Sequence, residues 1–200
     1  MSRPNLPKLV VASRNLGKIQ EFSVMLDGLF DVIPLSQTSF TDEVEETGET
    51  FFDNALLKAK AVFERVGGAV LSDDSGLCVE ALSGAPGVYS ARYAGADATS
   101  QKNIALLLQN MEDAKNRAAK FVACLILYRG ENDYVTACGE TTGSILKAPD
   151  GQSGFGYDPV FYSDELKKSF GRADETEKNA ISHRGRALVE LINKLKTRQG

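Results

Sequence analysis

The chain has 200 residues, and its 27 acidic side chains outnumber its 23 lysines and arginines, giving a formal net charge of −4 at pH 7. This length is enough for a single domain with a sizeable core. The acidic balance argues against a surface that coats nucleic acid, which would need an excess of basic residues.

The first predicted element is a short buried strand at residues 8–12 (KLVVA), rich in β-branched side chains. The apolar run is too short and too interrupted to predict a signal peptide or a membrane span. We therefore expect a cytoplasmic protein with no membrane partner.

A polar loop at residues 13–18 follows, and then apolar residues recur at helical spacing: Ile19, Phe22, Leu26 and Leu29. A strand, a small polar loop and a helix with a lysine in its first turn can offer backbone N–H groups and a cation to a phosphate. The loop is not a Walker A motif, because Ala12 stands where a glycine is needed and Ile19 where Ser or Thr is needed. Alternatively, Ser13 or Asn15 simply caps the helix and Lys18 is solvated.

Residues 31–35 are a plausible second strand, and residues 41–50 (TDEVEETGET) are too acidic to be buried. Thr47 or Thr50 can cap the helix that follows, and Gly67 with Gly68 can end it. The apolar face of this helix consists of Leu56, Leu57, Ala59, Val62, Phe63 and Val66.

The apolar run at residues 68–71 leads into two adjacent carboxylates, Asp73 and Asp74, followed by Ser75 and Gly76. We interpret this as a strand that ends in acids and turns on a glycine, an arrangement that can hold a metal at a sheet edge. Further on, residues 84–95 contain three glycines and a proline, which predicts a structured loop of fixed turns.

Thr99 or Ser100 can cap a helix that runs through Met111. Residues 120–128 and 134–143 flank a polar turn and predict a long β-hairpin. An antiparallel pair inside a β/α chain predicts a mixed sheet.

Residues 153–161 (SGFGYDPVF) hold Phe155 between two glycines, but Pro159 replaces the third glycine of a dinucleotide-binding motif. Phe155 can stack on a flat ligand or fill the core in a tight turn. A short polar helix at residues 174–180 follows. Ser182 then caps a last helix with His183 and Arg184 in its first turn.

The three cysteines, Cys78, Cys124 and Cys138, show no C-x-x-C spacing. We expect them to be buried thiols in a reducing compartment.

Taken together, these stretches resemble the inosine triphosphate pyrophosphatase family, also called the Ham1 or RdgB family. The resemblance extends from the first strand to the last helix. It is carried by ASRNLGK at residues 12–18, EETG at 45–48, Asn54 with Lys58, DDSGL at 73–77, GAPGVYSARY at 84–93, FGYDP at 155–159, and Lys178 with SHRG at 182–185.

The resemblance implies a single α/β domain over residues 1–200, with an elongated mixed sheet flanked by helices and two lobes around a central nucleotide cleft. It also implies a magnesium-dependent homodimer that hydrolyses ITP, dITP or XTP to the monophosphate and pyrophosphate. Asp74 would accept the proton of the attacking water, with Asp73 adding negative charge beside it. Glu45 and Asp74 would bind Mg²⁺, although the residues themselves do not separate Glu45 from Glu46.

The substrate-binding residues implied in the same way are Ser13, Arg14, Asn15, Leu16, Gly17, Lys18, Lys58, Ser75, Phe155, Gly156, Tyr157, Asp158, Lys178, His183 and Arg184. Lys18 and Lys58 would neutralise the triphosphate, and Phe155 would stack on the purine. Arg184 and His183 are the candidate donors to the 6-oxo group, Asp158 could accept from ring N–H groups, and Lys178 would help to close the pocket. The alternative functions are a non-catalytic nucleotide-binding regulator and a phosphatase that releases orthophosphate.

Overall fold

The structure is a computed structural model that describes residues 6–198. Seven strands form one sheet in the order β2-β1-β3-β4-β5-β6-β7. β1 pairs in parallel with β2 and β3, whereas β5 with β6 and β6 with β7 pair antiparallel, so the prediction of a mixed sheet is confirmed. The strands are β1 (Lys8–Val11), β2 (Asp31–Pro34), β3 (Val70–Val79), β4 (Ala118–Gly130), β5 (Asp133–Ile145), β6 (Phe161–Ser163) and β7 (Lys168–Ser169).

The chain divides into two compact units, and β3, β4, β5 and the last helix pass from one unit into the other. Among the described residues, the first unit comprises residues 6–74, 124–137 and 188–198, and the second comprises residues 75–123 and 138–187. The α-helices in the described part of the chain are α1 (Leu16–Met25), α2 (Phe51–Val66), α3 (Ser100–Asn110), α4 (Glu175–Ile181) and α5 (His183–Arg198).

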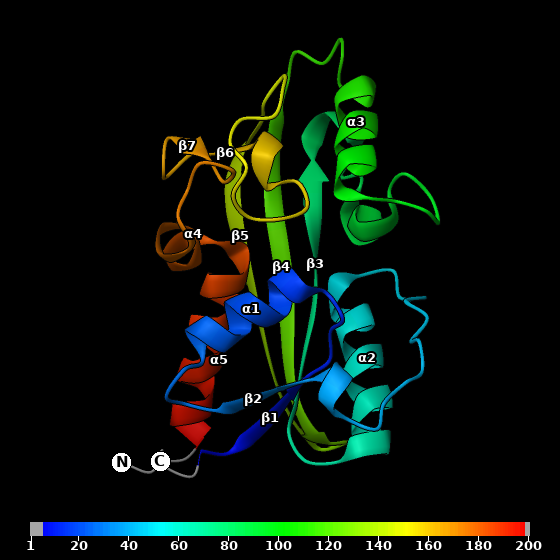
Figure 1. The fold of residues 1–200 in the computed structure, drawn as a ribbon, viewed down its shortest axis with the longest axis vertical. Coiled ribbons are helices and arrows are strands. Elements are labelled where there is room, and N and C mark those ends of the chain that lie inside the picture. The colour runs from blue at the N-terminus through cyan, green and yellow to red at the C-terminus, as the bar shows by residue number, and fades with distance from the viewer. Residues whose placement is uncertain (1–5, 199–200) are drawn as a thin grey trace. The chain divides into compact units, whose positions relative to one another are not determined.

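In the first unit, α2 packs along the strands (Figure 1). The Thr50 hydroxyl accepts a hydrogen bond from the Asp53 N–H and starts the helix, and Gly67, at φ +66°, ends it. The apolar face of α2 packs on β1, β3 and β4, burying Ala55, Ala59, Val62, Val70, Ile126 and Tyr128. This packing therefore fixes the position of α2 along β3.

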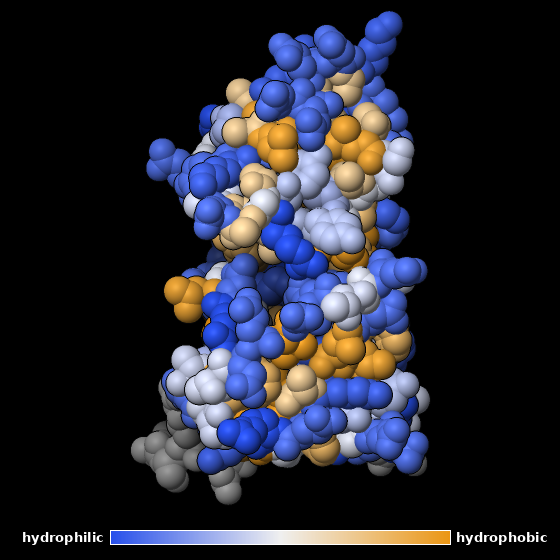
Figure 2. All heavy atoms as spheres, turned by 90° about the vertical axis from the view of Figure 1, so that its right-hand side faces the viewer, coloured by the Kyte–Doolittle hydropathy of each residue, from blue (hydrophilic) through white to orange (hydrophobic). Residues whose placement is uncertain are grey.

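The side of the first unit that carries α2 is mainly hydrophilic, with apolar side chains between the charged ones (Figure 2). Leu57 is exposed there, and Phe52, Leu56 and Phe63 are partly buried against the core. Such a mixture is ordinary for a protein surface.

In the second unit, α3 packs on β3 and β4, and β6 and β7 lie at one edge of the sheet (Figure 1). The Thr99 hydroxyl caps α3, as predicted, by accepting from the Lys102 N–H. The core consists of Leu77, Val79, Ile104, Leu107, Met111, Ala119, Phe121, Ile145, Tyr157, Val160, Phe161 and Phe170. Each unit thus has a hydrophobic core of its own.

Two predictions about local structure are corrected, and two short strands were not predicted. β3 does not end at the acids but continues through them to Val79, because the residues after Gly76 are apolar and pack in the second core. α1 ends at Met25 and leaves Leu29 exposed. The strands β6 and β7 were not predicted because they are only three and two residues long. The hairpin is confirmed, with β4 and β5 joined by Glu131 and Asn132.

The prediction for the cysteines is also wrong in part. Cys124 and Cys138 are disulfide-bonded, and Cys138 is exposed. Cys78 is a half-buried free thiol whose pKa is raised by burial.

Among residues 6–198, no helix has the length and apolar character needed to cross a membrane.

Candidate active site

Asp73 and Asp74 are consecutive residues of β3, and their side chains therefore point to opposite faces of the sheet. The Asp73 carboxylate pairs with Lys18 of α1 (Nζ–Oδ2 3.2 Å), whereas the Asp74 carboxylate pairs with Lys58 of α2 (Nζ–Oδ1 3.0 Å). Both acids are buried, with 2% and 5% of their surface exposed. Each therefore depends on its lysine for compensation of its charge.

Lys58 links two carboxylates. Its ammonium donates to Asp74 Oδ1 at 3.0 Å and to Glu46 Oε1 at 2.7 Å. Glu46 comes from the acidic loop before α2, so this cation draws the loop and the centre of β3 together. We call Lys58, Glu46 and Asp74 the Lys58 cluster.

The charges of this cluster shift the pKa values of its members. Burial raises the pKa of the Asp74 carboxyl, and the nearby Glu46 raises it further, against the opposing effects of Lys58 and Lys18. Burial alone would lower the pKa of Lys58, but the negative charges of Asp74, Glu46 and Asp73 outweigh it and raise that pKa. At neutral pH Lys58 is therefore a cation, and Asp74 is a better proton acceptor than an ordinary aspartate.

The acidic loop is fixed to the start of α2 by Asn54, which is completely buried. The Asn54 Oδ1 accepts a hydrogen bond from the Gly48 N–H at 2.8 Å. A Cβ at Gly48 would lie 2.6 Å from the Asp53 Cβ and 2.9 Å from the Asn54 N, so the loop contacts the helix too closely for any other residue. This contact determines where Glu46 meets Lys58.

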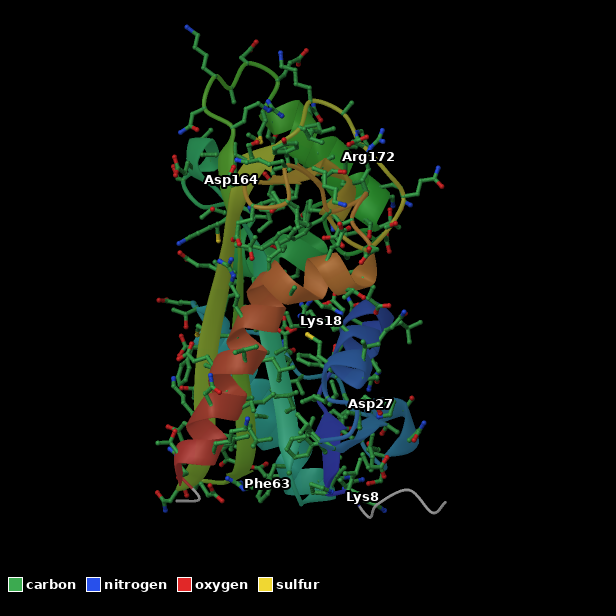
Figure 3. The ribbon with its side chains drawn as sticks, turned by 90° about the vertical axis from the view of Figure 1, so that its left-hand side faces the viewer. Lys8, Lys18, Asp27, Phe63, Asp164 and Arg172 are labelled. Atoms are coloured by element: carbon green, nitrogen blue, oxygen red, sulfur yellow. The ribbon has the colours of Figure 1, made fainter. Side chains whose placement is uncertain are left out.

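The loop between β1 and α1 places the predicted phosphate-binding residues at a helix N-terminus. The Asn15 side chain caps α1 by accepting from the Lys18 N–H, and the Ser13 hydroxyl accepts from the Asn15 N–H. Arg14 instead donates to the carbonyls of Thr41 and Asp42 (2.7 and 2.9 Å), so it holds the start of the acidic loop. Lys18 lies in the first turn of α1 (Figure 3).

The same loop contains a large exposed side chain. Leu16 is 80% exposed, and Gly17 beside it is partly buried. Both therefore stay predictions as substrate contacts.

The carboxylates of the first unit suit Mg²⁺. Among the described residues, no group of three or more His, Cys, Asp or Glu side chains is placed to hold a metal alone. Mg²⁺ does not need such a group, since it commonly takes one or two carboxylates together with substrate phosphates and water. Asp74 Oδ2 is buried without a hydrogen-bond partner among the described residues. It is therefore a suitable ligand atom.

The two glutamates of the acidic loop differ in their surroundings. Glu46, in the Lys58 cluster, is only half-exposed, whereas Glu45 is exposed. The structure thus brings Glu46 to Asp74, and the assignment of Glu45 as ligand stays a prediction.

In the second unit, Asp158 organises the loop that carries Phe155. Its Oδ2 accepts from the Phe155 N–H at 2.8 Å and from the Lys178 ammonium at 2.6 Å. Lys178 also lies over the Phe155 ring, 4.7 Å from its centroid. Gly154, at φ +75°, leaves no room for a Cβ, which would fall 2.1 Å from Asp158 Oδ2.

The first turn of α5 brings Arg184 to the same aromatic ring. Arg184 is buried, donates to the Ser75 hydroxyl at 2.9 Å, and lies 5.7 Å from the Phe155 centroid. Its neighbour His183 stacks on Phe121 with 4.8 Å between ring centroids, as part of the packed interior. The Ser182 hydroxyl caps this turn, as predicted, by accepting from the Gly185 N–H.

The candidate residues therefore form two groups. One is rich in carboxylates and lysines, and lies in the first unit. The other has an aromatic ring, an aspartate and two cations, and lies in the second unit, together with the half-buried Gly156 and the buried Tyr157, whose ring packs in the core. The contacts of Asn54 were not predicted, although Asn54 belongs to a matching motif, because a buried amide has no sequence signal of its own.

Comparison with known proteins gives consistent matches. The model of the Ham1 family matches residues 9–194. The dITP/XTP pyrophosphatase of a Bacillus cereus strain is 44% identical over 196 residues, covering 96% of each chain, and that of Exiguobacterium sibiricum is 47% identical over 193 residues, covering 95% of this chain and 98% of the relative.

Two solved structures agree with this result. The Staphylococcus aureus Ham1 protein has a TM-score of 0.85 at 38% identity, covering 96% of this chain and 99% of its own. A HAM1 protein from Coxiella burnetii has a TM-score of 0.86 at 40% identity, covering 96% and 100%.

Proposed function

Because the chain belongs to the Ham1 family, we propose that it hydrolyses the triphosphates of deaminated purine nucleosides, ITP, dITP and XTP, to the monophosphate and pyrophosphate. The observation that carries the proposal is the Lys58 cluster, in which a buried aspartate with a raised pKa and a second carboxylate share one lysine. The name dITP/XTP pyrophosphatase, given to relatives that align over nearly the whole chain, supports the substrate class.

The first group of residues acts on the triphosphate. Water attacks the α-phosphorus, the Asp74 carboxylate takes its proton, and the bond from the α-phosphorus to the bridging oxygen breaks to release pyrophosphate. General-base catalysis of this kind contributes about 10²- to 10⁴-fold. Lys18 and Lys58 lower the negative charge of the phosphates, and the N-terminus of α1 offers backbone N–H groups.

Mg²⁺ is the cofactor in this proposal. When bound, it polarises the phosphate oxygens and neutralises charge on the leaving pyrophosphate. Asp74 and one glutamate of the acidic loop, Glu45 or Glu46, would hold it; the shared contact of Glu46 and Asp74 with Lys58 supports Glu46.

The second group binds the purine base and distinguishes its 6-oxo group from an amino group. Phe155 stacks on the purine, and Arg184 donates to the 6-oxo group of hypoxanthine or xanthine. Adenine presents an amino group at the same position, so two donors would face each other unpaired and ATP would be rejected. Asp158 and Lys178 keep Phe155 in place, and Ser75 orients the guanidinium of Arg184.

A non-catalytic regulator is not favoured, because Asp73, Asp74, Glu45 and Glu46 are all present. The homodimer and the cytoplasmic location stay predictions.

The decisive experiment is a panel of ITP, XTP, dITP, GTP and ATP at one Mg²⁺ concentration, with pyrophosphate and orthophosphate separated. We expect pyrophosphate from the first three and little product from ATP. Orthophosphate alone would identify a phosphatase, and tight binding without turnover would identify a regulator.

The role of Arg184 is tested in the same panel. Arg184→Ala should reduce the preference for ITP over ATP. Equal losses for the two nucleotides would mean that Arg184 acts on structure or phosphate and does not read the base.

A further inference from the structure

The loop at residues 84–93 (GAPGVYSARY) has no role in the proposed chemistry, yet its contacts converge on one residue. This residue is Ser90, 6% exposed, in the 3-10 helix Gly87–Arg92. Its hydroxyl accepts from the Leu77 N–H at 2.9 Å and donates to the Gly87 carbonyl at 2.6 Å. Ser90 therefore joins the loop to β3, two residues beyond the Ser75 that contacts Arg184.

Two further side chains donate hydrogen bonds to the carbonyl of Ser90. The Tyr157 hydroxyl donates to it at 2.9 Å, and the buried Asn103 amide of α3 donates to it at 3.3 Å. The same amide reaches the Ala91 carbonyl at 3.1 Å, while its Oδ1 accepts from the Ala94 N–H at 2.8 Å. Asn103 thus bonds to the C-terminal end of the 3-10 helix and to the residue that follows Tyr93, and it fixes the direction of the Ser90 carbonyl.

Tyr157 is the link to base recognition. It stands between Phe155 and Asp158 in the chain, and its ring is buried in the core of the second unit, with 5% of the residue exposed. Burial raises the pKa of its hydroxyl, with Tyr93 nearby raising it further, so that Tyr157 stays a hydrogen-bond donor over the working pH range. The Phe155–Asp158 loop is therefore held in two ways: the Asp158 carboxylate bonds to Lys178 and to the Phe155 N–H, and the Tyr157 hydroxyl bonds to Ser90.

We propose that Ser90 and Asn103 are positioning residues for purine recognition, holding Tyr157 and, through it, the Phe155–Asp158 loop in the geometry that receives the base. This inference rests on the proposed function for the identity of the ligand. It gives the loop at residues 84–93 a role: its turns place one carbonyl where Tyr157 and Asn103 both donate to it.

The chain offers a matched pair of variants for the test. Tyr157→Phe removes only the hydroxyl that bonds to Ser90. Tyr93→Phe makes the same chemical change nearby, at a hydroxyl that accepts from Asn110 Nδ2 (2.8 Å) and has no bond to Ser90 in the described contacts. The ligands are IMP, which contains the base, and tripolyphosphate, which does not.

We expect Tyr157→Phe to weaken IMP binding, and to raise KM for ITP, by about 3- to 10-fold, the effect of one lost hydrogen bond. Tripolyphosphate affinity and kcat should stay within about twofold, since neither depends on base position. Tyr93→Phe should resemble the wild type in all four quantities. Unchanged IMP affinity in Tyr157→Phe, or equal losses for the two ligands or for the two variants, would overturn the proposal.

Asn103→Ala provides a second measurement in the same calorimetric assay. Because Asn103 and Tyr157 donate to one carbonyl, their combined variant should lose less IMP affinity than the two single losses multiplied together. Independent effects would contradict a shared role. Wild-type protein that binds IMP but fails to release pyrophosphate from ITP would refute the proposed function while leaving the test of Ser90 and Asn103 intact.

Discussion

At the scale of single residues, the site depends on the alternation of side chains along β3. Asp73 and Asp74 are adjacent in sequence, yet the first contacts α1 and the second contacts α2. A strand directs consecutive side chains to opposite faces, so the pair does not act as one acidic patch. Asp74 shares Lys58 with Glu46, and Asp73 is neutralised by Lys18.

This division of roles predicts different kinetics for two matched substitutions. Asp74→Asn should lower kcat by at least about 10²-fold with ITP binding largely retained, since it removes the proton acceptor. Asp73→Asn should act mainly through Lys18 and raise KM more than it lowers kcat. Steady-state kinetics on both variants checks this, and equal losses of kcat would contradict it.

The raised pKa of Asp74 predicts a pH dependence. Activity requires the ionised carboxylate, so kcat/KM should fall as the pH is lowered through a pKa above the ordinary value of 3.8. Asp74→Asn should lack this limb. A pH profile of wild-type kcat/KM that stays flat down to the ordinary aspartate range would show that Asp74 is not the base.

The raised pKa of Asp74 also makes the free energy of unfolding depend on pH. A carboxyl whose pKa is raised by folding binds its proton more tightly in the folded state. Its contribution to stability is therefore present below 3.8 and lost as the pH rises through the raised value. Replacement by Asn, which does not titrate, should remove this dependence from the free energy of unfolding.

Gly48 provides a test of how the acidic loop is positioned. Gly48→Ala puts a Cβ within 3.0 Å of Asp53 and Asn54 and should push the loop away from α2. We expect weaker Mg²⁺ binding, measured by calorimetry, together with a lower Tm. Glu49→Ala, at the exposed neighbouring position, is the control and should leave Mg²⁺ affinity near that of the wild type.

At the scale of elements, the short helix α4 carries one of the buried cations of the second group. α4 has seven residues and is stabilised by a capping box, in which Asp174 accepts from the Glu177 N–H while the Glu177 carboxylate accepts from the Asp174 N–H. Lys168 of β7 donates to Glu177 and lowers the pKa of its carboxyl. This helix carries Lys178, whose buried ammonium pairs with Asp158.

The capping box can be removed without touching the site. Asp174→Ala should destabilise the protein by about 1 kcal/mol, the usual cost of losing an N-cap side chain. Because α4 positions Lys178, KM for ITP should rise as well. Glu175→Ala, in the same exposed first turn but outside the box, should have a smaller effect on Tm and none on KM. Equal effects would mean that the cap does not position Lys178.

At the scale of the whole molecule, each unit has its own hydrophobic core and its own group of functional side chains. The first group supplies carboxylates and lysines for a metal-bound triphosphate, and the second supplies an aromatic ring and cations for a purine. Tripolyphosphate should therefore stabilise the protein through the first group, and IMP through the second.

This expectation is measurable by thermal unfolding. IMP with Mg²⁺ and tripolyphosphate with Mg²⁺ should each raise the Tm of the wild-type protein. A ligand present at 100 times its Kd stabilises the folded state by about 2.7 kcal/mol. EDTA should remove most of the effect of tripolyphosphate and little of that of IMP; equal sensitivity would contradict the separation of roles.

The sequence by itself determined the mixed sheet, the hairpin, the cap at Ser182 and the family, and it limited each of three other helix caps to two candidates, of which the structure has Asn15, Thr50 and Thr99. These follow from local signals, because β-branched runs, polar turns and capping side chains act within a few residues. It also determined which residue types the site contains, because each matching motif specifies both the residue types and the number of residues between them.

Only the tertiary structure decided which of these residues meet. The continuation of β3 past Gly76 depends on packing in a core built from distant segments, and the separation of Asp73 from Asp74 depends on which helices cover the two faces. The placement of Glu46 beside Asp74 depends on the Gly48–Asn54 contact. The hydrogen bonds at Ser90 join residues up to 67 positions apart in the chain. Such pairings are selected by burial and hydrogen-bond satisfaction in the folded chain, for which a single sequence carries no local signal.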